Sequence, residues 1–342
     1  MSRDSFHSAI RSEGSRTSAQ PGGPSAAGAA GAASPPLLVI AGATATGKTG
    51  LAIDVAERLA GEGIAAEVIS ADSRQVFRGL DIGTAKASVQ ERRGIRHHGL
   101  DLVEPDEPFS LADFAAHARA ALDGIAARDG LAILAGGTGL YLRAVARGIA
   151  TDALPADPEL RARLEAEFLA VGLDPLVERL RTNAPDRAAS VDLRNPRRVV
   201  RALEIAALDG GTGRLPEPRG YQGPLAWIGL VVERPTHLEW IGHRARAQFD
   251  AGLIEEARAL RGRFDPGLPA FSAIGYREAW SVIDGLLDRE QAIVEDARRN
   301  AAFAKRQRTW FQAEPDVVWL DGARIPLERA LAMAHDLIDA TS

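Results

Sequence analysis

The sequence contains Gly42-Ala43-Thr44-Ala45-Thr46-Gly47-Lys48-Thr49, and this stretch decides the fold. It fits the phosphate-binding pattern G-x-x-x-x-G-K-[ST] at every defined position. An apolar run at 37–41 precedes it and predicts a buried strand. A helical pattern follows, whose apolar face holds Leu51, Ala52, Val55, Ala56 and Leu59. The order strand, loop, helix therefore indicates a phosphate-binding loop and not a chance match, although it does not say which phosphate is bound.

The chemistry of the loop follows from its residue types. Backbone N–H groups of the loop and of the following helix N-terminus converge on an anion. Lys48 adds a positive point charge, and the hydroxyl of Thr49 is a candidate ligand for Mg²⁺. We therefore expect a phosphate-containing ligand, with Mg²⁺ as the cofactor.

The composition limits the classes of protein to which this chain can belong. The chain has 342 residues, of which 46% are hydrophobic and 25% charged, as in ordinary globular proteins. It has no cysteine, which excludes disulfides, thiolate zinc sites and cysteine nucleophiles. The formal net charge of −5 implies no global attraction to nucleic acid, so only local basic clusters could bind it. No apolar run is long enough to span a membrane, and we expect a cytoplasmic protein.

The N-terminal segment 1–36 is rich in Ser, Ala, Gly and Pro. Such a segment buries too little apolar surface to offset its ordering entropy, and we expect a disordered tail. An organellar transit peptide is the alternative, because Arg and Ser are present, but Asp4 and Glu13 and the Pro/Gly-rich end favour a plain tail.

Residues 37–150 alternate between strand and helix patterns, which predicts an α/β core with a parallel sheet. A β-type run at 67–72 ends in Asp72, and the apolar strand 131–135 ends in a glycine turn with Thr138. Because the carboxyl ends of parallel strands face the ligand crevice, both side chains should point toward the ligand of the loop. The alternative for Asp72 is a capping residue or a water-mediated Mg²⁺ ligand. Between these strands, Ser110 and Asp113 form a capping box that starts a helix.

The pattern changes at about residue 151. Asp157-Pro158 and Asn195-Pro196 each combine an N-cap with a first-turn proline, and no strand pattern intervenes, so 151–222 is predicted to be a helical insertion. The run at 227–232 predicts a strand that rejoins the sheet. In the last part, 223–342, helical patterns then cover about 236–262, 272–286, 288–312 and 326–340.

Two of these helices carry basic clusters. The first cluster consists of Arg197, Arg198 and Arg201, and the second of Arg298, Arg299, Lys305 and Arg306. Both are candidate contacts to a phosphate backbone. The alternative is a solvated helix face whose charges pair with neighbouring acids.

Taken together, the motifs resemble those of the bacterial tRNA dimethylallyltransferases. The resemblance covers about residues 37–320 and rests on six motifs in the same order: the loop 42–49, Ser70 to Lys86, Gly136-Gly137-Thr138-Gly139-Leu140-Tyr141, Asn195 to Glu204, Gly275-Tyr276-Arg277, and Lys305 to Trp310. It implies a P-loop NTPase-like parallel sheet flanked by helices, with an inserted helical lobe and a helical C-terminal part.

The resemblance also implies an activity, namely transfer of a dimethylallyl group from dimethylallyl diphosphate to N6 of adenosine 37 in tRNA. The loop would then hold the prenyl diphosphate and Mg²⁺, the latter on Thr49. By the same similarity Asp72 is the base, Thr138 lies near the bridging oxygen, and Arg244 contacts the phosphate. The partners implied are dimethylallyl diphosphate and the anticodon arm of a tRNA with A36-A37-A38, and we expect a monomer.

The residues that the resemblance assigns to tRNA contact fall in five groups. They are Asp72, Ser73, Arg74, Gln75 and Thr138; Arg161; Arg197, Arg198, Val199, Val200 and Arg201; Ser272, Ala273, Ile274, Gly275, Tyr276 and Arg277; and Lys305, Arg306, Gln307, Arg308, Thr309, Trp310, Phe311 and Gln312.

The sequence departs from the family pattern at three positions. Ala43 and Thr46 replace a common proline and serine, and Trp240 stands where the family often has an arginine, four residues before Arg244. From the residues alone, three other functions stay open: a small-molecule or nucleoside kinase, a prenyltransferase of free adenine nucleotides, and an RNA-binding GTPase-like module.

Overall fold

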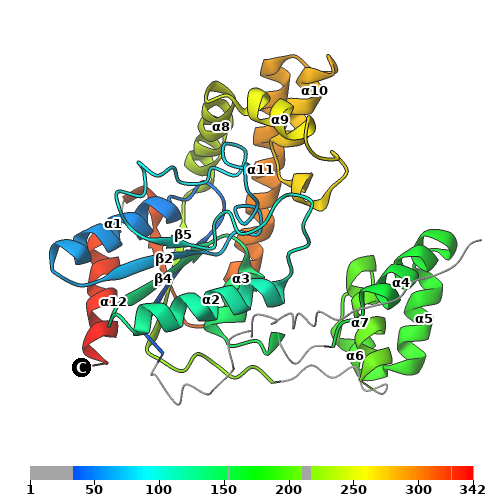
Figure 1. The fold of residues 1–342 in the computed structure, drawn as a ribbon, viewed down its shortest axis with the longest axis horizontal. Coiled ribbons are helices and arrows are strands. Elements are labelled where there is room, and N and C mark those ends of the chain that lie inside the picture. Colours follow the sequence, from blue (N-terminus) through cyan, green and yellow to red (C-terminus); the bar gives the residue numbers. More distant parts are fainter. Residues whose placement is uncertain (1–33, 152–154, 210–216, 325, 342) are drawn as a thin grey trace, which may run out of the picture. The chain divides into compact units, whose positions relative to one another are not determined.

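The computed structural model describes residues 34–151, 155–209, 217–324 and 326–341 (Figure 1). The predicted tail 1–36 lies almost wholly outside the described residues. The strands are β1 Leu37–Gly42, β2 Ala66–Ser70, β3 His97–His98, β4 Leu131–Gly136, β5 Leu225–Val231 and β6 Val317–Asp321. The helices are α1 Lys48–Gly61, α2 Leu111–Ala126, α3 Gly139–Ala146, α4 Pro158–Val171, α5 Asp174–Asn183, α6 Pro185–Ser190, α7 Pro196–Leu208, α8 Arg234–Asp250, α9 Leu253–Arg261, α10 Tyr276–Ile283, α11 Arg289–Gln312 and α12 Leu327–Asp339, with short 3₁₀ turns η2 Pro269–Ser272 and η3 Gly322–Arg324.

The strands form one parallel sheet in the order β3-β2-β4-β1-β5-β6. Strand β1, which leads into the phosphate-binding loop, lies between β4 and β5, with Val39 opposite Leu134 on one side and Trp227 on the other. The carboxyl ends of β1, β2 and β4 therefore meet at one edge of the sheet. This arrangement confirms the predicted P-loop NTPase-like parallel sheet.

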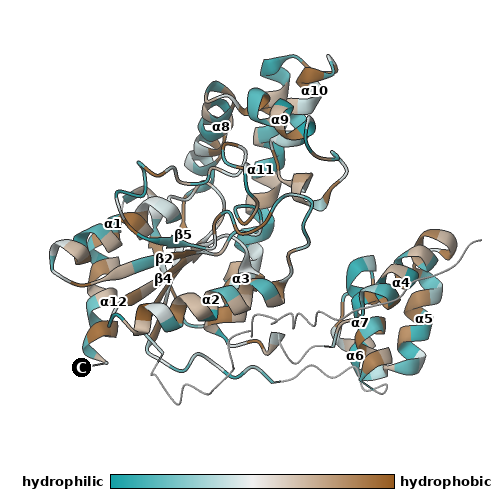
Figure 2. Ribbon diagram, viewed as in Figure 1, coloured by the Kyte–Doolittle hydropathy of each residue, from teal (hydrophilic) through white to brown (hydrophobic). Residues whose placement is uncertain are grey.

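Helices cover both faces of the sheet, as the apolar run of β1 requires. Leu38 and Ile40 point to one face, where they pack with α1 and α12. Leu37 and Val39 point to the other face, where the core includes α2, α3 and the helices α8 to α11. The strands of the sheet are largely brown in Figure 2, the colour of hydrophobic residues. The predicted capping box is also confirmed, since the Ser110 hydroxyl and the Asp113 carboxylate both make the expected bonds at the start of α2.

Helices α4 to α7 form the inserted lobe and have their own core. Leu176, Leu180 and Val199 are fully buried in it. Asp157 caps α4 and Asn195 caps α7, as the two proline signals predict. Where the chain leaves and re-enters the α/β core, Arg219 N donates to Gly148 O (2.9 Å) and Gly220 N donates to Arg147 O (3.2 Å). We call this pair of hydrogen bonds the neck of the lobe.

The last part of the chain differs from the prediction in three respects. The single helix expected at 236–262 is two helices, α8 and α9, because Gly252 adopts a left-handed conformation (φ 101°) between them. The helix expected from 272 starts only at Tyr276, after the turn η2. The strand β6 was not predicted at all, although it pairs with β5 at the edge of the sheet.

Among the described residues, no helix combines the length and the apolarity that a membrane crossing requires.

Candidate active site

The loop between β1 and α1 is held in a fixed shape by distant residues. Thr44 N donates to Gln307 Oε1 of α11 (2.8 Å), and Thr44 O lies 2.8 Å from Nε2 of His237 in α8. Gly47 stands at the N-cap of α1 with φ 86°, a conformation that favours glycine. At Gly42 any side chain would collide with Leu230 O, 2.9 Å from an ideal Cβ. The glycines of the motif thus serve the local backbone geometry.

Lys48 is the charged residue of the loop. Its ammonium donates to Ala43 O at 2.5 Å. Burial, assisted by the nearby positive charge of Arg244, lowers the pKa of Lys48 from 10.5 to about 7, while Asp72 opposes this effect. A bound anion would restore the full charge, so the loop is suited to a ligand with several negative charges.

Two cavities adjoin the loop. The first, of about 450 Å³, is lined by Gly47, Lys48 and Thr49 and on its other side by residues 85–87; we call it the phosphate cavity. The second, of about 400 Å³, is lined by Asp72, Thr138 and the cavity-facing residues of α11; we call it the acceptor cavity. Arg244 of α8 lines both. The guanidinium therefore lies where a ligand of the loop and a ligand beside Asp72 would meet.

Asp72 and Thr138 come from neighbouring strand ends, as predicted. Asp72 follows β2 by two residues, and its Oδ1 accepts from Arg74 N (2.8 Å). Thr138 follows β4, and its hydroxyl accepts from Ser73 N (3.1 Å). Thr138 N in turn donates to Ala71 O (3.1 Å), so the two strand ends are joined directly. The carboxylate of Asp72 keeps acceptor capacity toward the cavity.

Arg244 is half-buried, and its Nε atom lies out of contact with solvent. Its Nε has no hydrogen-bond partner among the described residues. Burial lowers the pKa of Arg244, whereas the carboxylates of Asp72 and Asp296 raise it. A buried guanidinium with spare donors is suited to a phosphate group.

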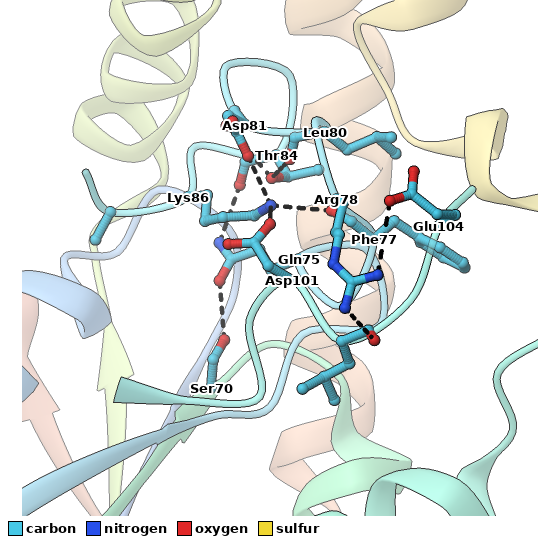
Figure 3. A network of polar contacts seen from close by, with 12 residues as sticks. Ser70, Gln75, Phe77, Arg78, Leu80, Asp81, Thr84, Lys86, Asp101 and Glu104 are labelled. Atoms are coloured by element: carbon cyan, nitrogen blue, oxygen red, sulfur yellow. Dashed lines mark hydrogen bonds and ion pairs between the residues drawn. The ribbon is translucent and has the colours of Figure 1, made fainter. Parts of the chain in front are cut away.

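Residues 79–87, which we call the pinned segment, contribute to the lining of both cavities. Polar contacts hold this segment in place (Figure 3). Nζ of Lys86 lies 2.6 Å from Asp81 Oδ1 and 2.5 Å from Asp101 Oδ1, and it also donates to Phe77 O. On the far side, the carboxylate of Glu256 accepts from Ile82 N (2.8 Å) and from the hydroxyl of Tyr276 (2.7 Å). These contacts hold the segment rigidly against α9 and α10.

The predicted tRNA contacts of the α/β core separate into surface and interior residues. Ser73, Arg74, Ser272, Ala273 and Ile274 line the acceptor cavity. The side chain of Gln75 is instead engaged within the protein, since it accepts from the Ser70 hydroxyl (2.8 Å) and donates to Thr84 O (3.1 Å). Gly275 and Tyr276 are buried, whereas Arg277 is exposed.

The segment Lys305–Gln312 divides in the same way. Gln307 is buried and joins the loop to Gly137 O (2.9 Å), and Phe311 is buried. Trp310 packs over Gly139 and under Arg143, whose guanidinium lies 4.4 Å from the ring centroid. The residues left at the surface are Lys305, Arg306, Thr309 and Gln312, with Arg308 half-buried. Trp310 and Phe311 thus support the site from behind, whereas Gln307 both supports the loop and lines the acceptor cavity.

In the lobe, some of the residues predicted to contact tRNA are engaged inside the protein. The side chains of Val199 and Val200 are buried and cannot reach an RNA. Arg161 and Arg201 both bind the buried carboxylate of Glu204, each at 2.8 Å.

Arg197 and Arg198 remain exposed on the lobe. In the second cluster, Arg298 pairs with Glu295 at the surface (2.6 Å) and Arg299 pairs with the buried Glu278. Arg306 has a contact to the ring of Phe303.

The described residues contain no cluster of three or more His, Cys, Asp or Glu that could hold a metal ion by itself. Thr49, the second residue of α1, lines the phosphate cavity and is exposed. Mg²⁺ commonly retains water and binds one or two protein oxygens together with substrate phosphates. The donor set therefore fits Mg²⁺ as the companion of a bound diphosphate.

Sequence reasoning missed several residues of the site. His237 holds the loop, and Asp296, Asn300 and Phe303 lie in or beside the acceptor cavity on α11. A signal for Asp296 and Asn300 exists in their spacing of four, which places two polar residues on one helix face. The same spacing also occurs on solvated faces, so it did not single them out.

The chain is similar to known proteins along most of its length. The family model described as IPP transferase matches residues 75–314. The tRNA dimethylallyltransferase of Anaeromyxobacter sp. (strain K) is 45% identical over 287 residues, which are 83% of this chain and 92% of that protein. The tRNA dimethylallyltransferase of Bifidobacterium animalis subsp. lactis is 38% identical over 313 residues, covering 89% and 90%.

Solved structures give a similar result. The full-length tRNA isopentenylpyrophosphate transferase from Bacillus halodurans has a TM-score of 0.64 and 37% identity, covering 89% of this chain and 97% of that chain. A eukaryotic dimethylallyltransferase acting on tRNA has a TM-score of 0.73 and 25% identity, covering 90% and 80%.

Proposed function

Because this chain belongs to the IPP transferase family of tRNA dimethylallyltransferases, we propose that it transfers the dimethylallyl group of dimethylallyl diphosphate to N6 of adenosine 37 in tRNA. The resemblance seen in the sequence motifs is thereby confirmed at the level of the family. The kinase and GTPase-like functions that the residues alone left open do not fit this family.

One observation supports this chemistry above all others: Arg244 lines both cavities. In the proposed reaction, the diphosphate occupies the loop side with Lys48 and Arg244, and the adenine occupies the side with Asp72. N6 forms a bond to C1 of the dimethylallyl group, the C1–O bond breaks, and diphosphate leaves. Lys48, Arg244 and the loop amides stabilise the negative charge that develops on the leaving group.

The nucleophile needs help, because the lone pair of the N6 amine is delocalised into the ring. Asp72 is the proposed base and takes one N6 proton as the new bond forms. Thr138, whose hydroxyl accepts from Ser73 N, is the proposed contact to the diphosphate near its bridging oxygen. Thr49 would hold Mg²⁺, which would supply further positive charge to the diphosphate. The adenine must leave its stack to enter the acceptor cavity.

The exposed arginines are the proposed tRNA surface. Arg298 and Arg306 at the cavity, Arg277 and Lys305 nearby on the chain, and Arg197 and Arg198 on the lobe are available to phosphates. We further propose that the protein acts as a monomer in the cytoplasm on the anticodon arm of one tRNA.

The test is a reaction of the purified protein with an anticodon stem-loop RNA carrying A36-A37-A38, dimethylallyl diphosphate and Mg²⁺. Mass spectrometry should find a prenyl group on A37. The variant Asp72→Asn should lose the chemical step by at least about 100-fold while binding the RNA normally. A wild-type protein that gives no adduct would overturn the proposal, and an undiminished Asp72→Asn would overturn the assignment of the base.

A further inference from the structure

Asp296 is a buried carboxylate that has no part in the proposed reaction. Asp296 lies in the middle of α11 and is 1% exposed. Its Oδ2 has no hydrogen-bond partner among the described residues. The charged groups that face it are Glu278 from α10, Arg244 from α8 and Arg299 from its own helix. Burying a carboxylate with an unpaired oxygen costs free energy, so we expect Asp296 to have a functional role.

The partner of Asp296 is Asn300, one turn later on α11. Nδ2 of Asn300 donates to Asp296 Oδ1 (2.7 Å) and approaches Asp296 O at 3.2 Å. An ionised carboxylate only accepts hydrogen bonds, so it fixes the amide with nitrogen toward Asp296 and oxygen away from it. Asn300 lines the acceptor cavity together with Asp72, and its Oδ1 has no hydrogen-bond partner in the described parts of the chain. The cavity therefore holds a second acceptor with a fixed orientation.

The chemistry of purines says what such an acceptor recognises. The only N–H donors of the adenine base in a nucleic acid are the two hydrogens of its N6 amino group. Guanine and inosine carry an oxygen at that position, which is itself an acceptor. The two acceptors in the cavity, Asp72 and Asn300, match the two N6 hydrogens of adenine. They would repel O6 of guanine or inosine, because O6 is itself an acceptor.

Building on the proposed function, we propose that Asn300, oriented by Asp296, accepts a hydrogen bond from the N6 amino group of the target adenosine. Asp72 accepts the other N6 hydrogen and removes it when N6 bonds to C1. The hydrogen on Asn300 stays with N6 in the product, which is a secondary amine with one hydrogen. Asn300 thus selects adenine, and Asp296 is a positioning residue that keeps the amide from turning.

A binding cycle without dimethylallyl diphosphate tests this interaction apart from the chemistry. The probes are two stem-loop RNAs that differ only at position 37, one with adenosine and one with purine riboside, which lacks the amino group. The proteins are the wild type and Asn300→Leu, which keeps the shape of the side chain. The preference of wild type for the adenosine RNA should exceed that of Asn300→Leu by about fivefold. Equal preferences in the two proteins would overturn the proposal.

The role of Asp296 needs its own variant. Asp296→Asn keeps the size but lets the neighbouring amide turn, so it should lose the same part of the preference, and the double variant should lose no more. Loss of affinity for both RNAs alike would mean that Asp296 only supports the fold. Val294→Ala, an exposed site on the same helix, is the matched control and should behave as wild type.

The pH gives a second readout. Burial raises the pKa of Asp296 from 3.8 to about 6. Below that pH a protonated Asp296 can donate to Asn300 Oδ1, and the wild-type preference for adenosine should shrink, whereas Asp296→Asn should show no such step. Prenylation of A37 by wild type is measured in parallel: its absence would refute the proposed function, while its presence without the fivefold coupling would refute only this inference.

Discussion

The side chain of Lys48 is only partly protonated at neutral pH in the free protein, and substrate binding therefore depends on pH. Its pKa of about 7 means that the ammonium loses its proton as the pH rises through neutrality. We predict that KM for dimethylallyl diphosphate rises above pH 7 by up to about tenfold per pH unit, because the loop then lacks its positive charge. Steady-state kinetics between pH 6 and pH 9 measure this. Lys48→Met should have a high KM with little change over the range, and a flat wild-type profile would contradict the prediction.

Asp296 should cost stability at neutral pH. Its folded pKa of about 6 exceeds its unfolded value of 3.8, so the native state binds more protons between these values and the free energy of unfolding falls as pH rises through them. Above pH 6 the loss is complete, at most about 3 kcal/mol. Asp296→Asn should therefore unfold at a higher temperature than wild type at pH 7.5, with a smaller difference at pH 4.5. Equal differences at both pH values in thermal melts would count against this.

Two cavity residues, Asp72 and Thr138, could be predicted from the sequence because each lies just after the end of a strand. Asp72 and Thr138 follow apolar strands, and the topology of a parallel sheet brings such residues together. Asp296 and Asn300 could not be found in this way, because polar residues in the middle of a helix look the same on a solvated face and on a buried one. For Arg161 the decisive neighbour, Glu204, is 43 positions away, so the pairing was invisible in the sequence.

Elements with strong periodicity were predicted and weakly patterned ones were not. The central strands β1 and β4 are apolar throughout. By contrast, β6 is an edge strand with exposed Val318 and Trp319, and its five residues lack a distinct alternation. The break between α8 and α9 rests on the backbone of Gly252, whose neighbours continue a helical pattern on both sides. In both cases tertiary packing decides what local sequence leaves open.

The packing of the pinned segment 79–87 against α10 can be tested by substitution of Gly83. An ideal Cβ on Gly83 would lie 2.6 Å from the ring of Tyr276, so Gly83→Ala should displace the segment from α10. We predict a loss of about 1–3 kcal/mol in the free energy of unfolding and lower activity. Gly242→Ala is the matched control. Nothing lies within 4 Å of its ideal Cβ, and in helix α8 it should stabilise by about 0.5–1 kcal/mol. A Gly83→Ala protein as stable as wild type would show that the segment yields to the methyl group.

At the scale of the whole molecule, a chain with a net charge of −5 must concentrate its positive charge to bind RNA. Arg306 lines the acceptor cavity and has no carboxylate partner among the described residues. We predict that Arg306→Ala weakens stem-loop binding and reduces the slope of log K against log salt by about one. Arg324→Ala, in the exposed turn η3, removes the same charge elsewhere and should leave the slope unchanged. If both variants changed the slope equally, the effect would be one of net charge alone.

The neck of the lobe allows the lobe to change in evolution without a change in the core. Two hydrogen bonds, at Gly148 and at Gly220, bring the departing and returning chain side by side. The strand order of the sheet therefore does not depend on the length or the sequence of what lies between them. The lobe can be lengthened, shortened or exchanged as a cassette while the chemistry of the core stays the same. Changes in the lobe and changes in the core are thus free to accumulate at different rates.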